Sequence, residues 1–551
     1  MNSIAKKKPF YLNYWNIISL LILLLLALFL IFPLFNLVSK SFFNTEGALS
    51  MENYVDFFSL KHYTSALQHS FLVCSIATVF AMLIGVPLAY LACRFSIKGK
   101  KLFNLLIVIS MLSPPFIGAY AWIILFGRSG FLRVLIGKLG IQFPSIYGFG
   151  GIILVFTIKF IPLIYLYVSG AIGSIDASLE EAAENLGMSK MKRILTITFP
   201  LILPTITAAM LMVFMAALAD FGTPMLIGEG YKVLLIYQQY LSEIGGDAGM
   251  ASTLSVVIIF FALLVLLIQR WIISKRSYTM SMLNPPKVTK LTGWRCALAT
   301  GICFFMAFVG ILPQLTVLVT SFLKTSGLIF FPEFSLDNYR ATFAKMGGAI
   351  LHTFSYSTIA IIIMVLLGIL ISYLSVRKRS KVNSALDLLV MFPYVIPGAV
   401  MGIALLLCFN KQPLVLTGTW MILVIAYVVR KLPYTIRSSS AILYQLDPCL
   451  EEASINLGVP PIRTFFKTTA ILMLPGVFSG AIMSWISTIN ELSASIMLYT
   501  SRTTTISVAI YTEVVRGSSG TAAALSVILS AATVLSVLLF TKLSGGKSIS
   551  L

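Results

Sequence analysis

The stretch LEEAAENLGMSKMKRILTITFPLILP, Leu179 to Pro204, places three glutamates and three basic residues in the middle of a mostly apolar chain. A second stretch, LEEASINLGVPPIRTFFKTTAILMLP, runs from Leu450 to Pro475 and aligns with the first without a gap. Eleven of the 26 aligned positions are identical. A simple connector between two helices has no reason to repeat at fixed spacing over this length. The repeat therefore predicts a chain of two related halves, each with one copy of the charged loop.

The composition places the chain in a membrane. Of its 551 residues 58% are hydrophobic and 11% are charged, and the mean hydropathy is +0.96, whereas a soluble domain carries about 25% charged residues. The apolar runs are continuous over about 20 residues, as in transmembrane helices, and do not alternate as barrel strands do. We therefore predict an all-α polytopic membrane protein.

We predict twelve transmembrane helices, six in each half. The first six are Trp15–Val38, Phe71–Leu91, Leu102–Phe126, Gly150–Ile172, Pro204–Leu226 and Met250–Ile273. The second six are Cys296–Phe322, Phe354–Leu374, Leu386–Leu407, Leu414–Ile436, Leu472–Met497 and Thr521–Leu543. Prolines in Ser113-Pro114-Pro115 and at Pro393 and Pro397 are expected to break the third and the ninth span, and broken helices either line a transport pathway or are packing kinks.

The positive charge sets the orientation. The formal net charge is +21, and most Lys and Arg residues fall between spans on one side. Because basic residues accumulate in cytoplasmic loops, both termini and both charged loops are predicted to be cytoplasmic. The segment 127–149, with Arg128, Arg133 and Lys138, runs against this bias. Nucleic-acid binding is not expected, because no basic patch interleaved with aromatic residues lies on a polar module.

The two halves are parallel repeats. The offset of 271 residues that relates the charged loops also pairs Pro162 with Pro433, and an offset of 283 pairs Tyr90 with Tyr373. Six spans in each half return the chain to the same side, so the halves are related by an axis along the membrane normal. We assign the first repeat to residues 1–274, a cytoplasmic linker to 275–295 and the second repeat to 296–551.

Each charged loop is predicted to form a short helix, a glycine turn and a second helix that enters the membrane. Asp176 can cap the first short helix, and Asp447-Pro448 repeats this start in the second. The glutamates then fall in the first turn, where the helix dipole favours negative charge. Gly187 and Gly458 follow after about two turns and suit a left-handed C-cap.

This pattern resembles the EAA loop of ABC importer permeases, E-A-A-x3-G-x9-I-x-L-P. The first loop matches as Glu181, Ala182, Ala183, Gly187, Ile197 and Pro200, with Phe199 in the Leu position. The second matches as Glu452, Ala453, Ser454 and Gly458, but Thr468-Thr469-Ala470-Ile471 replaces its tail. The second loop is therefore expected to leave the turn with a different geometry.

The resemblance implies two permease subunits fused into one chain. It implies docking of two copies of a cytoplasmic ABC ATPase at residues that include Glu180 and Glu451, and delivery of the substrate by an extracytoplasmic binding protein. The sequence lacks G-x-x-x-x-G-K-[ST], so ATP and Mg are expected on the partner ATPase, and this chain is expected to bind no cofactor and to perform no catalysis of its own.

Charged residues inside spans are candidates for the transport pathway. The repeat pairs Lys159 with Arg430 and Asp220 with Glu491. In one interpretation they form buried ion pairs that hold helices together. In another the two acids line the pathway for a hard cation, and in a third the two bases contact an anionic substrate. No metal cluster is predicted: the three histidines are scattered, and the six cysteines form no CxxC.

The segments ADFGTPMLIG (219–228), ELSASIMLY (491–499) and GTAAALSVIL (520–529) resemble the ferric-iron branch of fused permeases. This resemblance implies ferric iron as the substrate. Branches for 2-aminoethylphosphonate, thiamine, polyamines or sulfate are alternatives. An ion-coupled secondary transporter would share twelve spans and two halves but would not need two EAA loops, and no catalytic set supports a membrane-embedded enzyme.

Overall fold

The computed structural model describes residues 14–44, 47–111, 114–140, 144–233, 248–275, 288–378 and 380–543. Within these residues, ten helices are long and apolar enough to cross a membrane. A bent pair forms an eleventh candidate: α17 (Lys381–Met391) with η4 (Phe392–Tyr394) meets α18 (Gly398–Cys408) at 109°. The all-α membrane fold is confirmed.

The first repeat consists of helices and short helical turns. In chain order they are α1 (Tyr14–Leu26), η2 (Ala27–Ile31), α2 (Phe32–Lys40), α3 (Glu52–Ser59), α4 (Lys61–Arg94), α5 (Lys100–Met111), α6 (Pro115–Phe126), α7 (Phe131–Gly137), α8 (Phe149–Gly173), α9 (Ala177–Asn185), α10 (Lys190–Arg193), η3 (Ile194–Thr198), α11 (Phe199–Leu218), α12 (Gly222–Ile227) and α14 (Ala248–Lys275).

The second repeat has the same order of long helices. It consists of α15 (Gly293–Ser321), the hairpin β1 (Leu323–Ser326) and β2 (Ile329–Phe334), α16 (Asp337–Arg377), α17, η4, α18, α19 (Trp420–Gln445), α20 (Cys449–Asn456), α21 (Pro461–Thr464), η5 (Phe465–Thr469), α22 (Ala470–Ile489), α23 (Ser495–Leu498), α24 (Ile506–Val515) and α25 (Ser519–Leu543). The two strands pair antiparallel, and their register shifts between Leu323 and Lys324.

The predicted count of twelve spans is not confirmed. The missing span corresponds to α19, in which every stretch long enough to cross a membrane contains Arg430, Lys431 and Arg437. The predicted break near Pro114 separates α5 from α6, with Ser113 outside the described residues, and the predicted break at Pro393 and Pro397 separates α17 from α18. The prolines therefore break both spans as expected, because a proline removes a backbone donor and disfavours helix at the preceding residue.

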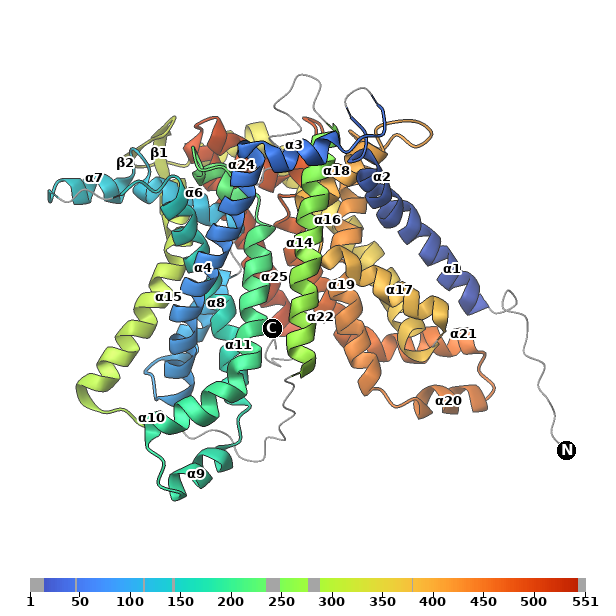
Figure 1. Ribbon diagram of the computed structural model, residues 1–551, viewed down its shortest axis with the longest axis horizontal. Helices are drawn as coiled ribbons and strands as arrows, with labels where there is room; N and C mark the ends of the chain where they lie inside the picture. Colours follow the sequence, from blue (N-terminus) through green and yellow to red (C-terminus); the bar gives the residue numbers. More distant parts are fainter. Residues whose placement is uncertain are drawn as a thin grey trace.

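The charged loops lie at one end of the molecule, on opposite flanks (Figure 1). Helices α9 and α10 form the loop of the first repeat, and α20 and α21 form that of the second. The hairpin, α3 and α7 lie at the other end. Helix α7, which belongs to the segment 127–149, is therefore on the side opposite the charged loops in spite of the basic residues of that segment.

The first helix of each repeat packs against the other repeat. Helix α2 packs on α18 and α1 packs on α17, both in the second repeat. In the same way, α15 packs on α5 and α6 of the first repeat. The backbone near residue 95 also pairs with the end of the linker, because Phe95 and Thr289 form a β-bridge. The repeats are consecutive in sequence, but their first helices are exchanged in space.

Two glycines bring α22 unusually close to α19. A Cβ on Gly476 would lie 2.2 Å from Cγ1 of Ile442, and one on Gly480 would lie 2.7 Å from Cα of Thr435. Together they form a G-x-x-x-G, the spacing that lets membrane helices approach closely. The corresponding residues of the first repeat are Thr205 and Ala209, so the close approach belongs to the second repeat.

Candidate functional site

The two charged loops fold as predicted from their caps. In the first loop Asp176 accepts the N–H of Ser178 at 2.9 Å and starts α9. In the second, Asp447 accepts the N–H of Cys449 at 2.9 Å, and this bond holds the pKa of the Asp447 carboxyl below its usual value. Gly187 and Gly458 end the helices with φ of 77° and 86°, the left-handed conformation of a C-cap.

A carboxylate ties each short helix to the end of a long one. In the first repeat Glu180 forms an ion pair with Arg94 of α4 at 2.5 Å and accepts the hydroxyl of Thr198 at 2.8 Å. In the second, Glu451 lies 4.0 Å from Arg377 of α16 and accepts the hydroxyl of Tyr373. These contacts connect the short helices α9 and α20 to the ends of α4 and α16.

The helices that follow the two glycine turns have the same bounds in both repeats. Helix α10, the π-helical turn η3 and α11 match α21, η5 and α22 residue for residue at the offset of 271. The expectation of a different exit from the second loop was wrong. The residues that flank η3 and η5 have nearly the same helical backbone angles, so the change from Phe199-Pro200 to Ala470-Ile471 leaves the backbone of this continuous helix unaltered.

Apolar side chains are exposed at equivalent places on both loops. Leu186 and Leu457 are each 84% exposed. Met191 and Leu195 on one loop, and Ile462 and Phe466 on the other, are also exposed. Exposed apolar patches in corresponding places are typical of surfaces that bind another protein. Sequence reasoning missed these residues, although a leucine before each glycine was a visible signal.

The predicted docking residues divide into an outer and an inner set. Exposed residues are Ala182, Gly187, Glu452, Ala453 and Gly458, whereas Ala183 and Glu451 are buried and Glu180, Glu181 and Ser454 are half-buried. The inner set holds the loop in place and the outer set forms its free surface, as far as the described residues show.

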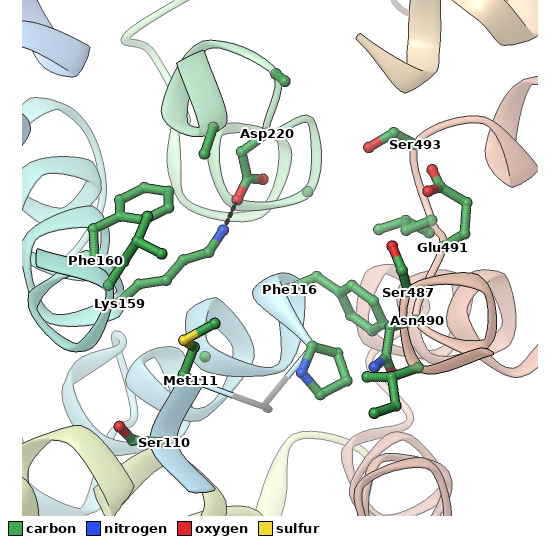
Figure 2. A pocket seen from close by; sticks show the side chains of 18 of the residues that line it. Ser110, Met111, Phe116, Lys159, Phe160, Asp220, Ser487, Asn490, Glu491 and Ser493 are labelled. Atoms are coloured by element: carbon green, nitrogen blue, oxygen red, sulfur yellow. Dashed lines mark hydrogen bonds and ion pairs between the residues drawn. The ribbon is translucent and has the colours of Figure 1, made fainter. Parts of the chain in front are cut away.

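A cavity of about 520 Å³ lies between the two repeats. Figure 2 shows Lys159 and Asp220 on one wall and Glu491, Ser487 and Asn490 on the facing wall. Lys159 comes from α8, and Asp220 follows the end of α11. Glu491 takes the same place after α22. The four charged residues that the repeat pairs in sequence therefore surround one space.

Asp220 forms an ion pair with Lys159. The carboxylate also accepts the N–H of Thr223 at 3.0 Å and its hydroxyl at 3.2 Å, and only 4% of the side chain is exposed. The geometry thus agrees with the ion-pair interpretation, and the same two residues also line the cavity. The two interpretations do not exclude one another.

Glu491 binds two cations. Its carboxylate lies 2.5 Å from Arg430 Nη1 and 2.7 Å from Lys431 Nζ, and it accepts the N–H of Ala494 at 3.1 Å. Lys431 was not predicted as part of the site, because the equivalent residue of the first repeat is Phe160. The cavity therefore carries three cationic and two anionic side chains.

Within the described residues, no group of three or more His, Cys, Asp or Glu side chains could hold a metal ion. Two of the histidines contact backbone carbonyl oxygens through their rings. His69 Nδ1 lies 2.9 Å from the carbonyl oxygen of Lys232, and His352 Nδ1 lies 3.1 Å from that of Thr504. The carboxylates of Asp220 and Glu491 are the acidic groups of the cavity that could contact a cation in passage.

Comparison with known proteins gives the class. Residues 81–278 and 364–546 match the family of binding-protein-dependent transport system inner membrane components. These two segments cover more than half of the chain, one in each repeat. The chain belongs to this family, and it is a multi-pass membrane subunit of a binding-protein-dependent transport system.

The relatives point to one branch of that class. The chain is 30% identical to the ferric transport system permease protein FbpB of Actinobacillus pleuropneumoniae, over 82% of this chain and 67% of that protein. It is 31% identical to the putative ferric transport system permease protein FbpB 1 of Haemophilus influenzae, over 80% and 70%. The molybdenum transport system permease protein ModB of Escherichia coli is 29% identical over 36% of this chain and 89% of its own length.

A solved structure of a bacterial ABC transporter involved in the import of the acidic polysaccharide alginate is also similar to the chain. It covers 47% of this chain and 94% of its own, at 19% identity and a TM-score of 0.40.

Proposed function

We propose that the chain is the translocation subunit of an ATP-driven importer and carries ferric iron. The observation that carries this proposal is the likeness, over about four fifths of the chain, to two proteins named as ferric transport permeases. An external binding protein selects the iron and releases it to the cavity between the repeats.

The loops at α9 and α20 each dock one copy of a cytoplasmic ATPase. Their exposed leucines, Leu186 and Leu457, supply an apolar contact, and the ion pairs Arg94–Glu180 and Arg377–Glu451 connect the contact to α4 and α16. ATP biases the membrane subunit only if the docked ATPases bind its two conformations with different affinity. With the loops on the cytoplasmic side, both termini are cytoplasmic too.

Asp220 and Glu491 are the first contacts of the cation inside the cavity. Carboxylate oxygens suit a hard cation such as Fe³⁺. In the conformation seen here Lys159, Arg430 and Lys431 neutralise the two acids. An arriving cation displaces the basic side chains from the carboxylates, and they return when the cation leaves.

Uptake of ⁵⁵Fe³⁺ into proteoliposomes tests this function. The vesicles hold the chain, its ATPase and its iron-loaded binding protein. We expect uptake that requires ATP and that excess molybdate or spermidine leaves unchanged. Asp220→Asn should lower uptake on the order of tenfold, the loss of one charge-assisted contact, while the ATPase still copurifies with the variant.

Two results would contradict the proposal. Uptake of molybdate or spermidine in place of iron would move the chain to another substrate branch. Loss of the bound ATPase in Asp220→Asn, with a lower melting temperature, would mean that Asp220 only holds helices together. Thr207→Val is the matched control, because Thr207 lies on the same helix but does not line the cavity.

A further inference from the structure

A second cavity, of about 690 Å³, lies between α14 of the first repeat and α17, η4 and α19 of the second. Its walls are largely apolar, with Leu263 and Leu266 on α14 and Leu388 on α17. Three charged side chains also line it: Arg270 on α14, Asp387 on α17 and Arg437 on α19. A cavity with this lining can bind a molecule that has both an apolar body and a charged end.

The charged end of the cavity lies near the ends of its helices on the side of the charged loops. Arg270 is five residues from the end of α14, Asp387 is six from the start of α17 and Arg437 is eight from the end of α19. At about 1.5 Å per residue these positions are about 8 to 12 Å from the ends of their helices. All three ends are on the side of the charged loops, because α19 leads into α20 and the lower end of α14 reaches the same side (Figure 1). The three charged side chains therefore lie within about two helical turns of the helix ends on the loop side of the protein.

The charged groups of the cavity are not neutralised by one another. Within the described residues, no ion pair joins Asp387 to a basic side chain, and the Nε of Arg437 contacts the sulfur of Met391 at 3.0 Å. Tyr394 and Tyr434 lie beside them, with ring centroids 5.6 Å apart. Two cations and one anion are therefore available to a ligand.

The symmetry-related positions carry no equivalent set of charges. The repeat offsets place Thr541, Asn104 and Leu166 where the cavity has Arg270, Asp387 and Arg437. Asn104 accepts the hydroxyl of Tyr165 at 2.7 Å and is thus engaged within its own repeat. The three charges are therefore not a requirement of the shared fold, and they occur together at one place in the molecule.

We propose that this cavity binds one phosphatidylethanolamine molecule from the leaflet next to the charged loops. The phosphate lies between Arg270 and Arg437, which can donate several hydrogen bonds to it. The primary ammonium donates to Asp387, and the acyl chains lie along the leucines. Basic pockets between membrane helices are known to hold phospholipid headgroups. The carboxylate selects a headgroup that also carries a hydrogen-bonding cation.

Native mass spectrometry of the full chain in detergent tests this assignment. The probes are dioleoyl phosphatidylethanolamine, dioleoyl phosphatidylglycerol, dioleoyl phosphatidylcholine and inorganic phosphate. Phosphatidylethanolamine should bind with one saturable site and most tightly. Phosphatidylglycerol has no cation for Asp387, and the quaternary ammonium of phosphatidylcholine has no N–H to donate. Arg270→Gln with Arg437→Gln should weaken binding on the order of tenfold or more.

The variants separate the two parts of the headgroup. Asp387→Asn should remove the preference for phosphatidylethanolamine over phosphatidylcholine while retaining a bound lipid. Arg295→Gln, at the start of α15 on the same side and outside the cavity, is the matched control and should bind as the unchanged chain does. Equal binding of all three lipids, or of the double arginine variant, would overturn the site. Competition by inorganic phosphate at the lipid's own concentration would assign the cavity to a free anion instead.

Discussion

Glu491 stands out among the charged residues of the cavity because its carboxylate lies within 2.7 Å of two cations. Arg430 and Lys431 both form ion pairs with it, whereas in the described residues of the first repeat Asp220 pairs with one basic side chain, Lys159. Both acids are nearly buried, with 6% and 4% of their side chains exposed. Removing one partner of a buried ion pair leaves an uncompensated charge. The two acids therefore differ in how much the fold depends on them.

We predict that Glu491→Gln destabilises the chain more than Asp220→Asn does. The Glu491 variant leaves two buried cations without a counter-charge and should lose about 3–5 kcal/mol, the usual cost of breaking a buried pair. Asp220→Asn leaves one cation, Lys159, without a counter-charge, and 22% of the Lys159 side chain is exposed. Thermal unfolding of the purified variants in detergent measures the difference.

Lys431→Met provides the control for that prediction. As a single substitution, Lys431→Met leaves a one-to-one ion pair of Arg430 and Glu491 and should change the free energy of unfolding little. Combined with Glu491→Gln it should recover part of the lost stability. If both acids gave equal losses, or if Lys431→Met did not help, the second cation would have no role in balancing Glu491.

The sequence predicted part of this site. Intramembrane charge and the repeat were enough to pick out Lys159, Arg430, Asp220 and Glu491. Lys431 was not found, because it has no counterpart in the first repeat and its contact with Glu491 depends on how α19 turns toward α22. A position on a helix is visible in the sequence, but the face it presents to a neighbour is decided by tertiary packing.

At the scale of elements, the docking loops were the most predictable part of the chain. Their helix starts and ends depend on local groups: Asp176, Asp447 and the two glycines act within a few residues of themselves. The prediction of a different exit from the second loop was wrong because it depended on residue identity alone. The residues at the end of the motif differ between the loops, but α21, η5 and α22 have the same bounds as α10, η3 and α11.

We predict that Gly187→Val together with Gly458→Val uncouples ATP hydrolysis from transport. A Cβ at either position would meet nothing within 4 Å, so the effect is not a clash. It arises from the left-handed backbone, which costs an ordinary residue roughly 1–2 kcal/mol, and more for a β-branched one. The docking helix then loses its fixed angle to the helix that follows. ATPase activity and uptake, measured in the same proteoliposomes, should no longer change together.

Asparagine at the same two positions is the matched control, since it tolerates the left-handed region. Gly187→Asn with Gly458→Asn should retain coupling to a large extent. Unchanged uptake in the double valine variant would contradict a docking role for these turns, and equal loss in both double variants would show that the side chain itself blocks the partner.

At the scale of the whole molecule, the repeat predicted two halves but not how they join. The exchange of α1 and α15 leaves no signal in composition or periodicity, because a lipid-facing helix has the same apolar sequence whichever neighbour it contacts. The same applies to the cavity between the halves, which forms only when both repeats are in place. Internal symmetry was visible in the sequence, whereas the contacts across the symmetry axis were not.

The exchange makes the two repeats dependent on one another, and this gives a prediction for a divided chain. Helices α2 and α1 pack on α18 and α17, and α15 packs on α5 and α6, so either half alone exposes the surface that the other half's first helix covers.

We expect residues 1–280 and 281–551, expressed together, to copurify through a tag on one half and to transport, because this cut falls inside the predicted linker. Either half expressed alone should be degraded or aggregate. A cut between Ser335 and Leu336, which leaves α15 and the hairpin on the first half, is the informative comparison. Helix α15 then remains beside α5 and α6, and the second half still contacts it through α25. Transport by that pair would show that the packing of α15, and not its covalent connection to the second repeat, is what the assembly needs, whereas two halves that each fold and remain apart would contradict the exchange.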